Sequence, residues 1–207
     1  MQRILFFGDS ITDARRSREE DEWTGRGYVS LIAAKFGADC PGKYEFINRG
    51  VSGNRCVDLL SRIKIDCINL KPDYITVFAG VNDVLHEAAH KNGVSSEKSY
   101  QIFKMIIDEI KDKLPKTKII LMSPFVFYGC DTMYAWEFIE DGVKKSANVI
   151  KRIAKEYNLP LIVTQSVFDE TVKNSSVEYY IKDGVHPTLA GHEIIAREWI
   201  KVFRDLN

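Results

Sequence analysis

Short apolar segments recur along the whole chain and are separated by longer amphipathic ones. Five segments have the length and the apolar, β-branched composition of buried strands: residues 4–7, 46–48, 74–79, 118–122 and 161–163. The third of these, Tyr-Ile-Thr-Val-Phe-Ala, is nearly continuous in such residues, which indicates a strand that is covered on both faces. The pattern therefore predicts five strands in the protein interior.

Between the strands, apolar residues recur at the spacing of a helix that buries one face. Three such stripes comprise Phe103, Ile107, Ile110 and Leu114; Val143, Ala147, Ile150 and Ala154; and Ile195, Trp199, Val202 and Leu206. Pro115 predicts the end of the first of these helices. The alternation of strands and helices predicts an α/β domain of three layers, with helices on both faces of a five-stranded, mostly parallel sheet.

The composition narrows the class of protein. The 207 residues suffice for one sizeable core without an internal repeat or linker, so we expect a single domain over residues 1–207. Lys+Arg and Asp+Glu both number 29, a balance that gives no indication of a nucleic-acid partner. No apolar run approaches the roughly 20 residues of a membrane span, and residues 4–7 are too short for a signal peptide. We therefore expect a cytoplasmic protein with no membrane partner.

The cysteines lack the paired spacing of a zinc or redox motif and are expected to be free thiols: Cys40, Cys56, Cys67 and Cys130.

Polar residues follow each of the first three predicted strands, and ligands bind at the carboxyl ends of strands in parallel sheets. Ser10 follows the first strand, residues 48–54 follow the second, and Asn82 lies just after the third. Ser10 offers a hydroxyl and a backbone N–H at a helix start, where negative charge is favoured. A glycine within residues 48–54 lets the backbone approach a ligand closely, and Asn82 adds a side-chain amide donor. Together these groups predict a nucleophile with a three-donor oxyanion hole.

A second motif, Asp-Gly-Val-His-Pro at residues 183–187, precedes the last predicted helix. Asp183 and His186 are three residues apart and can meet on one turn. The carboxylate can then fix the imidazole tautomer while the other ring nitrogen faces a serine. With Ser10, these residues supply the nucleophile, the base and the orienting acid of a hydrolase.

These motifs resemble the signature of the SGNH (GDSL-type) hydrolase superfamily, over residues 4 to about 196. The signature residues of that family correspond to Ser10, Gly53, Asn82 and His186. The resemblance implies a flavodoxin-like fold and a Ser10–His186–Asp183 triad. It also implies an oxyanion hole formed by the N–H groups of Ser10 and Gly53 and the amide of Asn82.

Four segments are more specifically similar to the bacterial xylan-acetyl-esterase-like branch: residues 8–13, 27–29, 50–54 and 183–191. That branch removes acetyl groups from sugar hydroxyls, so the resemblance implies an acetylated sugar or oligosaccharide as the small-molecule substrate. It implies no cofactor, and it gives Asp9 a structural role.

We therefore expect a serine esterase that hydrolyses short-chain acetyl esters, deacetylating sugars or oligosaccharides through an acyl-enzyme. Two other hypotheses are a lysophospholipase or thioesterase of the same superfamily and a non-catalytic carbohydrate-binding protein. The natural sugar, the positional selectivity, the acyl-chain preference and the oligomeric state, a homo-oligomer included, stay open.

A zinc hydrolase is the alternative from a different class, because residues 86–90, His-Glu-Ala-Ala-His, match the helix signature of zinc proteases. His86 and His90 would bind the metal and Glu87 would act as the base. The position of the third metzincin histidine holds a serine, and Glu109 could be a third ligand only if the fold brought it close to the two histidines. We therefore interpret the motif as polar residues of a loop or short helix that borders the cleft, and we predict no metal.

Two further segments carry weaker signals. The charged stretch 15–22 after the serine motif is interpreted as a solvated loop, with a lid or rim of the site as the alternative. His192 is interpreted as a surface residue of the last helix.

Overall fold

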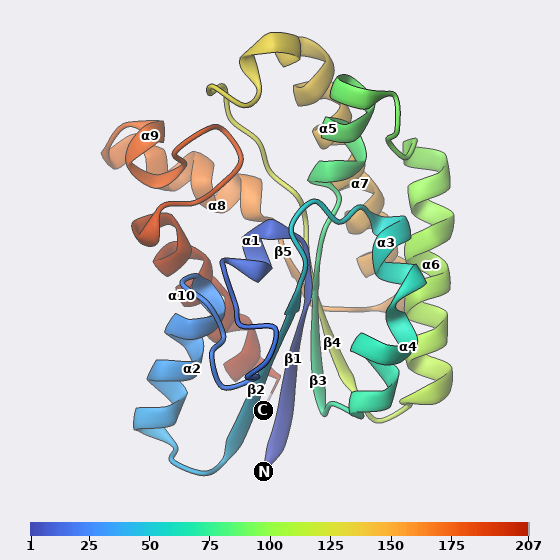
Figure 1. Ribbon diagram of the computed structural model, residues 1–207, viewed down its shortest axis with the longest axis vertical. Helices are drawn as coiled ribbons and strands as arrows, with labels where there is room; N and C mark the ends of the chain where they lie inside the picture. Colours follow the sequence, from blue (N-terminus) through green and yellow to red (C-terminus); the bar gives the residue numbers. More distant parts are fainter. Residues whose placement is uncertain (207) are drawn as a thin grey trace.

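A sheet of five parallel strands forms the centre of the computed structural model, which describes residues 1–206 (Figure 1). The strands lie in the order β2-β1-β3-β4-β5: β1 (Gln2–Gly8), β2 (Tyr44–Gly50), β3 (Tyr74–Phe78), β4 (Lys118–Met122) and β5 (Leu161–Ile162). All four pairings are parallel. The five expected strands are therefore confirmed.

The observed ends of the strands differ from the predicted ones where pairing extends a segment. β2 is longer at both ends than the apolar run 46–48, because it pairs along the whole of β1, from Gln2 with Tyr44 to Gly8 with Gly50. Backbone hydrogen bonds between the two strands thus extend to residues whose side chains do not predict a strand.

Helices cover both faces of the sheet, as Figure 1 shows. One face carries α2 (Tyr28–Asp39), α8 (Thr164–Thr171), α9 (Val177–Tyr180) and α10 (Leu189–Asp205). The other carries α3 (Cys56–Ser61), α4 (Ile63–Asp66), α6 (Ser96–Lys113) and α7 (Trp136–Tyr157). Two helices begin at strand ends, α1 (Ser10–Asp13) and α5 (Val81–His90), and three short 3₁₀ turns complete the set: Ile68–Leu70, Met133–Ala135 and Val172–Asn174.

Successive strand residues enter opposite core layers, which explains why the strands are apolar throughout. Phe6 packs with Trp199 of α10 at 5.2 Å between ring centroids, while its neighbour Leu5 belongs to the cluster that contains Phe103 of α6. The one polar residue in the middle of β3, Thr76, accepts a hydrogen bond from the indole N–H of Trp199 at 2.7 Å. This three-layer, flavodoxin-like α/β architecture is the one that the sequence predicts.

The three apolar stripes lie on the helices α6, α7 and α10, with one exception at a helix end. Leu114 falls just beyond α6, where its N–H still bonds the carbonyl of Ile110. The four cysteines are free thiols. Within residues 1–206, no helix combines the length and the hydrophobicity needed to cross a lipid bilayer.

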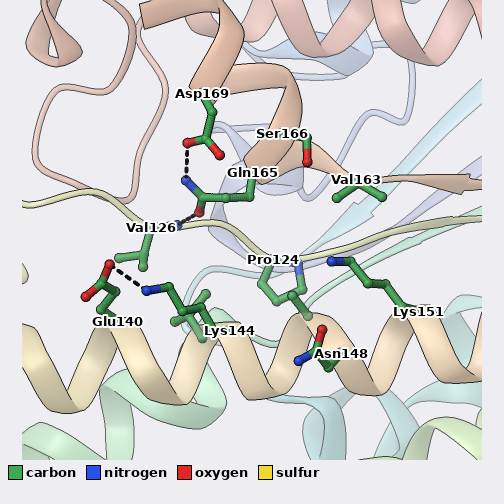
Figure 2. A pocket seen from close by; sticks show the side chains of 12 residues that line it. Pro124, Val126, Glu140, Lys144, Asn148, Lys151, Val163, Gln165, Ser166 and Asp169 are labelled. Atoms are coloured by element: carbon green, nitrogen blue, oxygen red, sulfur yellow. Dashed lines mark hydrogen bonds and ion pairs between the residues drawn. The ribbon is translucent and has the colours of Figure 1, made fainter.

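A cavity of about 480 Å³ opens between α7 and α8, beyond the ends of β4 and β5 (Figure 2). The polar side chains in it largely satisfy one another. Lys144 Nζ lies 2.8 Å from Glu140 Oε1, and Gln165 donates to Asp169 while accepting from the N–H of Val126. The residues that the sequence singled out at the ends of β1, β2 and β3 do not line this cavity.

Candidate active site

Ser10 is the first residue of α1 and follows β1 by one residue. The intervening Asp9 caps the helix, since its Oδ1 accepts a hydrogen bond from the N–H of Ile11 at 3.0 Å. The turn is tight: a Cβ atom at Gly8 would lie 2.4 Å from the carbonyl oxygen of Phe78, so only glycine fits there. The strand, the cap and the glycine together place the Ser10 hydroxyl at the carboxyl edge of the sheet.

The Asp9 carboxyl is buried beneath this turn. Burial raises its pKa to about 7, although the hydrogen bond from Ile11 and the proximity of His186 act in the opposite direction. Its contacts are those of a helix cap, which agrees with a structural role.

The structure brings Ser10, His186 and Asp183 into one hydrogen-bonded chain. Ser10 Oγ lies 2.9 Å from His186 Nε2, and His186 Nδ1 lies 2.9 Å from Asp183 Oδ2. The other carboxylate oxygen, Oδ1 of Asp183, accepts from the backbone N–H groups of Val185 at 3.0 Å and His186 at 2.7 Å. Residues that are 176 positions apart in the sequence therefore meet at this point.

The charge state of Asp183 determines the tautomer of His186. Burial disfavours the charged carboxylate, but the hydrogen bonds from His186 and Val185 outweigh it and lower the pKa of Asp183 to about 2. An ionised carboxylate can only accept, so Nδ1 of His186 is the donor. In the neutral imidazole, Nε2 then carries the lone pair and faces the Ser10 hydroxyl.

The same carboxylate makes His186 more basic. The hydrogen bond to Asp183 raises the pKa of His186 above its ordinary value, burial opposes this, and the nearby charges of Asp183, Asp9 and Asp131 add to the increase. A base with a raised pKa holds a proton more firmly once it has taken it from a nucleophile.

The three predicted oxyanion donors lie at the ends of three neighbouring strands. Within residues 1–206, the backbone N–H groups of Ser10 and Gly53 form no hydrogen bond, and Gly53 adopts the left-handed conformation with φ +81°. Asn82, in the first turn of α5, is buried and donates one amide hydrogen to the carbonyl of Asn54 at 3.1 Å. One hydrogen of this amide is therefore used to fix its orientation, and the other is left for a ligand.

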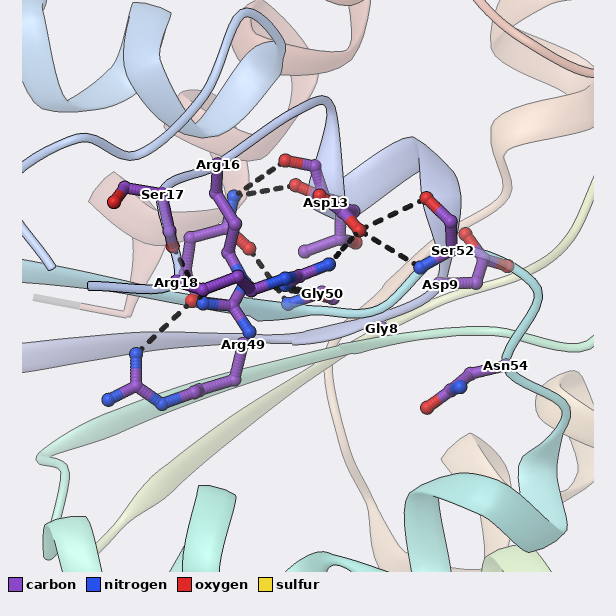
Figure 3. A network of polar contacts seen from close by, with 12 residues as sticks. Gly8, Asp9, Asp13, Arg16, Ser17, Arg18, Arg49, Gly50, Ser52 and Asn54 are labelled. Atoms are coloured by element: carbon purple, nitrogen blue, oxygen red, sulfur yellow. Dashed lines mark hydrogen bonds and ion pairs between the residues drawn. The ribbon is translucent and has the colours of Figure 1, made fainter. Parts of the chain in front are cut away.

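A polar network ties the loop after β2 to α1 (Figure 3). Asp13 Oδ2 accepts from both the N–H and the hydroxyl of Ser52, each at 3.0 Å, and from the guanidinium of Arg18 at 2.5 Å. Arg16 and Arg18 both donate to the carbonyl oxygen of Gly50, each at 2.9 Å. The network holds the segment that carries Gly53 against the helix that carries Ser10.

A second link joins the same segment to α5. Both carboxylate oxygens of Asp83 lie within 3.2 Å of the N–H of Cys56, and the thiol of Cys56 donates to Oδ1 at 2.8 Å. Burial raises the pKa of Asp83 to about 6 despite these bonds. Asp83 is the neighbour of Asn82, so this contact fixes the amide donor relative to Gly53.

The stretch 15–22 is only partly the solvated loop that the sequence favoured. Arg16 and Arg18 are hydrogen-bonded within the network of Figure 3, and Arg15 lines a cavity of about 380 Å³ beside Ser10 and His186. The rim interpretation therefore describes this end of the stretch. The acidic residues Glu19, Glu20 and Glu22 are exposed, as expected of a loop.

The prediction for His192 was wrong. Its side chain is buried, its ring stacks on Tyr28 at 6.3 Å between centroids, and Nδ1 accepts from the N–H of Tyr28 at 3.2 Å. Burial lowers the pKa of His192 to about 4, so the ring is neutral. It satisfies one of the free N–H groups at the start of α2, a role that depends on packing between helices far apart in the sequence.

The His-Glu-x-x-His motif lies on α5, beside the Gly53 loop. Glu87 Oε2 accepts from the N–H of Gly93 at 3.0 Å, so this carboxylate is engaged in closing the turn after the helix. Among the residues that the structure describes, a group of three His, Cys, Asp or Glu side chains close enough to hold a metal ion is formed by Asp131, Asp183 and His186. Neither histidine of the motif, nor Glu109, belongs to such a group.

The sequence analysis did not assign a role in the site to several residues that the structure places there. Asp13 lies three residues after Ser10 on the same helical turn, a spacing that could have indicated it. Arg15, Arg16 and Arg18 are indistinguishable from a charged surface loop before the tertiary structure is known.

A parallel α/β sheet with a serine, a histidine and an aspartate hydrogen-bonded at its carboxyl edge is the framework of an ester hydrolase. The chain belongs to the GDSL-like lipase/acylhydrolase family, whose sequence profile matches residues 6–194. It is 32% identical over 214 residues to an acetylxylan esterase from Geobacillus stearothermophilus, covering 97% of this chain and 93% of that protein. It is accordingly an esterase by family.

Solved structures agree with this assignment. The crystal structure of the Geobacillus acetylxylan esterase has a TM-score of 0.87 and 32% identity, covering 97% of this chain and 93% of the other. A Parabacteroides merdae protein described as GDSL-like has a TM-score of 0.89 and 31% identity, covering 97% of this chain and 94% of the other. For the Geobacillus enzyme, structures of catalytic mutants with alanine in place of a serine, an aspartate and a histidine are also known.

Proposed function

We propose that this protein is a serine esterase that removes acetyl groups from acetylated sugars or oligosaccharides through a Ser10–His186–Asp183 triad. The observation that carries the proposal is the hydrogen-bonded chain from Ser10 Oγ to His186 Nε2 and from His186 Nδ1 to Asp183. The catalytic mutants of the Geobacillus enzyme, which replace the same three residue types, support it.

The geometry supports a two-step acyl transfer. In the first step, Nε2 of His186 takes the proton of the Ser10 hydroxyl as Oγ forms a bond to the ester carbonyl carbon. The tetrahedral intermediate collapses when the carbon–oxygen bond to the sugar breaks, and His186 returns its proton to the sugar oxygen. Water then attacks the acetyl-serine, again losing a proton to His186, and acetate leaves as the proton returns to Ser10.

The negative charge of each tetrahedral intermediate needs donors that are fixed in advance. This role is supported by the unbonded N–H groups of Ser10 and Gly53 and by the free amide hydrogen of Asn82. Their loops are held by Asp13 and Asp83, so little reorganisation accompanies the development of charge.

Substitution of one donor tests the oxyanion hole. We expect Asn82→Ala to lower kcat by about 10²- to 10³-fold with little change in KM, because the lost hydrogen bond is made in the transition state. Steady-state kinetics on a soluble acetyl ester measure the effect. Asn148→Ala, at an exposed position on α7, is the matched control and should behave as the wild type. A kcat for Asn82→Ala within a few-fold of the wild type would place the oxyanion hole elsewhere.

The choice of an acetyl substrate rests on the acetylxylan esterase relative and on the charged side chains that line the cavity beside Ser10. That cavity measures about 380 Å³, and charged side chains belong to its lining. A long acyl chain would require apolar surface to gain roughly 0.8 kcal/mol per buried CH₂ group. The charged side chains of Arg15, Arg26 and Lys182 interrupt such a surface in this cavity.

A series of nitrophenyl esters from two to twelve carbons tests the function. We expect kcat/KM to be highest for acetyl and to fall steeply beyond butyryl, and acetylated xylose or xylo-oligosaccharides to release acetate. A maximum at eight carbons or more would favour the lysophospholipase or thioesterase hypothesis. Absence of turnover with every ester would leave the non-catalytic carbohydrate-binding hypothesis.

A further inference from the structure

The cavity beside the candidate nucleophile is lined by cations and by no carboxylate. Arg15, Arg26 and Lys182 belong to its lining together with Ser10 and His186, and neither aspartate nor glutamate does. The chain as a whole has no net charge, with 29 basic and 29 acidic residues. The positive charge at this cavity is thus a local feature of the site.

The two arginines are unpaired, unlike most arginines of the protein. Arg3 pairs with Glu45, Arg49 with Asp21 and Arg62 with Asp66. Within residues 1–206, the guanidinium groups of Arg15 and Arg26 form neither a hydrogen bond nor an ion pair.

Lys182 is less available than the arginines, since its Nζ lies 4.0 Å from Asp183 Oδ2. In the cavity between α7 and α8 (Figure 2), Lys144 is likewise paired with Glu140. Arg15 and Arg26 are therefore free to bind an anion from solution.

The backbone holds the two arginines next to each other. The N–H of Arg26 donates to the carbonyl of Ala14 at 2.7 Å, which joins the segment of Arg26 to the residue before Arg15. Ala14 and Arg15 both adopt left-handed backbone conformations, with φ +40° and +62°. Residues with side chains rarely do so, and such strain is found where the surrounding structure fixes a functional segment. Arg15 lies in the turn that directly follows α1, and Arg26 lies two residues before α2, so the hydrogen bond from Arg26 to Ala14 anchors both segments.

Guanidinium groups bind carboxylates and phosphates in paired, charge-assisted hydrogen bonds. We propose that the substrate of this site is an acetylated sugar that carries a carboxylate or phosphate, bound by Arg15 and Arg26 while Ser10 attacks the acetyl group. This inference rests on the proposed function, and it names the class of the alcohol that the enzyme releases: an acidic sugar.

The test compares three acetyl esters of one sugar: O-acetyl glucose, O-acetyl glucuronate and O-acetyl glucose phosphate. The measured quantity is the ratio of kcat/KM for each anionic ester to that for the neutral one. We expect a wild-type ratio of about 10 to 100 for at least one anion, the range of a hydrogen-bonded charge contact. The ester with the higher ratio identifies the carboxylate or the phosphate as the group that is recognised. Ratios near one for both anions would overturn the proposal.

Variants assign the preference to the arginines. In the double variant Arg15→Gln/Arg26→Gln, the ratio should fall towards one. In the control Arg204→Gln, at an exposed position near the end of α10 and outside this cavity, the ratio should stay at the wild-type value. A double variant that keeps the wild-type ratio would overturn the proposal.

A binding measurement separates this inference from the proposed function. If no ester is cleaved, the proposed function fails, but calorimetry with glucuronate and glucose 6-phosphate, against glucose, still reports on the arginines. Anion binding that the double variant loses would support the arginine site by itself. Equal binding of the anions and glucose would refute it.

Discussion

The Ser10→Ala variant is expected to lose ester hydrolysis, with kcat lower by about 10⁴- to 10⁶-fold, and to keep its fold. Among the described residues, the hydroxyl of Ser10 bonds only to His186, and one such hydrogen bond contributes about 0.5–1.5 kcal/mol to stability. A fluorophosphonate probe, which reacts with activated serines, should label the wild type but not the variant. Thermal unfolding checks that the fold is retained.

The control for this experiment is another serine in a comparable surface hollow. Ser166 is exposed on α8, at the cavity between α7 and α8, and has no histidine beside it in that cavity (Figure 2). Ser166→Ala should retain both activity and labelling. Labelling that persists in Ser10→Ala would show that a different side chain is the nucleophile.

The Asp183→Asn variant is expected to lower kcat by about 10⁴-fold, because it disturbs the tautomer of His186. The amide NH₂ of the new side chain would face Nδ1, which then has to accept. The proton of the neutral ring then moves to Nε2. A protonated Nε2 faces the Ser10 hydroxyl as a donor and cannot take the hydroxyl proton. The fold should persist, since the amide oxygen can still accept from the N–H groups of Val185 and His186.

The pH dependence provides a second readout of the same residue. His186 must be neutral to act as a base, and its raised pKa means that wild-type kcat/KM is lost as the pH falls through a value above the ordinary histidine pKa of about 6.5. Without the charge of Asp183 that pKa falls, so the acid limb of the residual activity should move to lower pH. A limb that stays in place would contradict the assignment.

Asp131→Asn is the matched control for Asp183→Asn. The Asp131 charge also raises the pKa of His186, but Asp131 is exposed and, in the part of the chain that the structure describes, forms no hydrogen bond to the ring that would fix its tautomer. We expect a small shift of the acid limb and a change in kcat of less than about tenfold, since an exposed charge is screened by solvent. If both variants lost the same activity, charge alone would explain the effect of Asp183.

Local motifs in the sequence were sufficient where a residue's role depends on its immediate neighbours. Ser10 follows a buried strand, and Asp183 and His186 share one turn, so each could be placed from spacing alone. The remaining step, contact between residues 176 positions apart, follows from the parallel α/β fold, which brings strand ends and the last helix together.

His192 illustrates what spacing cannot show. Its position on an amphipathic helix is compatible with either exposure or burial. The outcome depends on α2, because the N–H of Tyr28 at the start of that helix donates a hydrogen bond to Nδ1 of His192. The ends of β2 likewise could not be predicted from local sequence, because they are determined by pairing with β1.

Periodicity and short-range spacing were enough to predict the strand–helix alternation and to single out Ser10, His186 and Asp183, because both features are encoded locally. Which charges are neutralised, by contrast, depends on how the chain folds. Arg16 and Arg18 turn inward to the carbonyl of Gly50, whereas Arg15, their neighbour, is left unpaired at the cavity beside Ser10. The reason is physical: a charged side chain pairs with whatever group the fold brings within about 3 Å, and those groups come from distant parts of the chain.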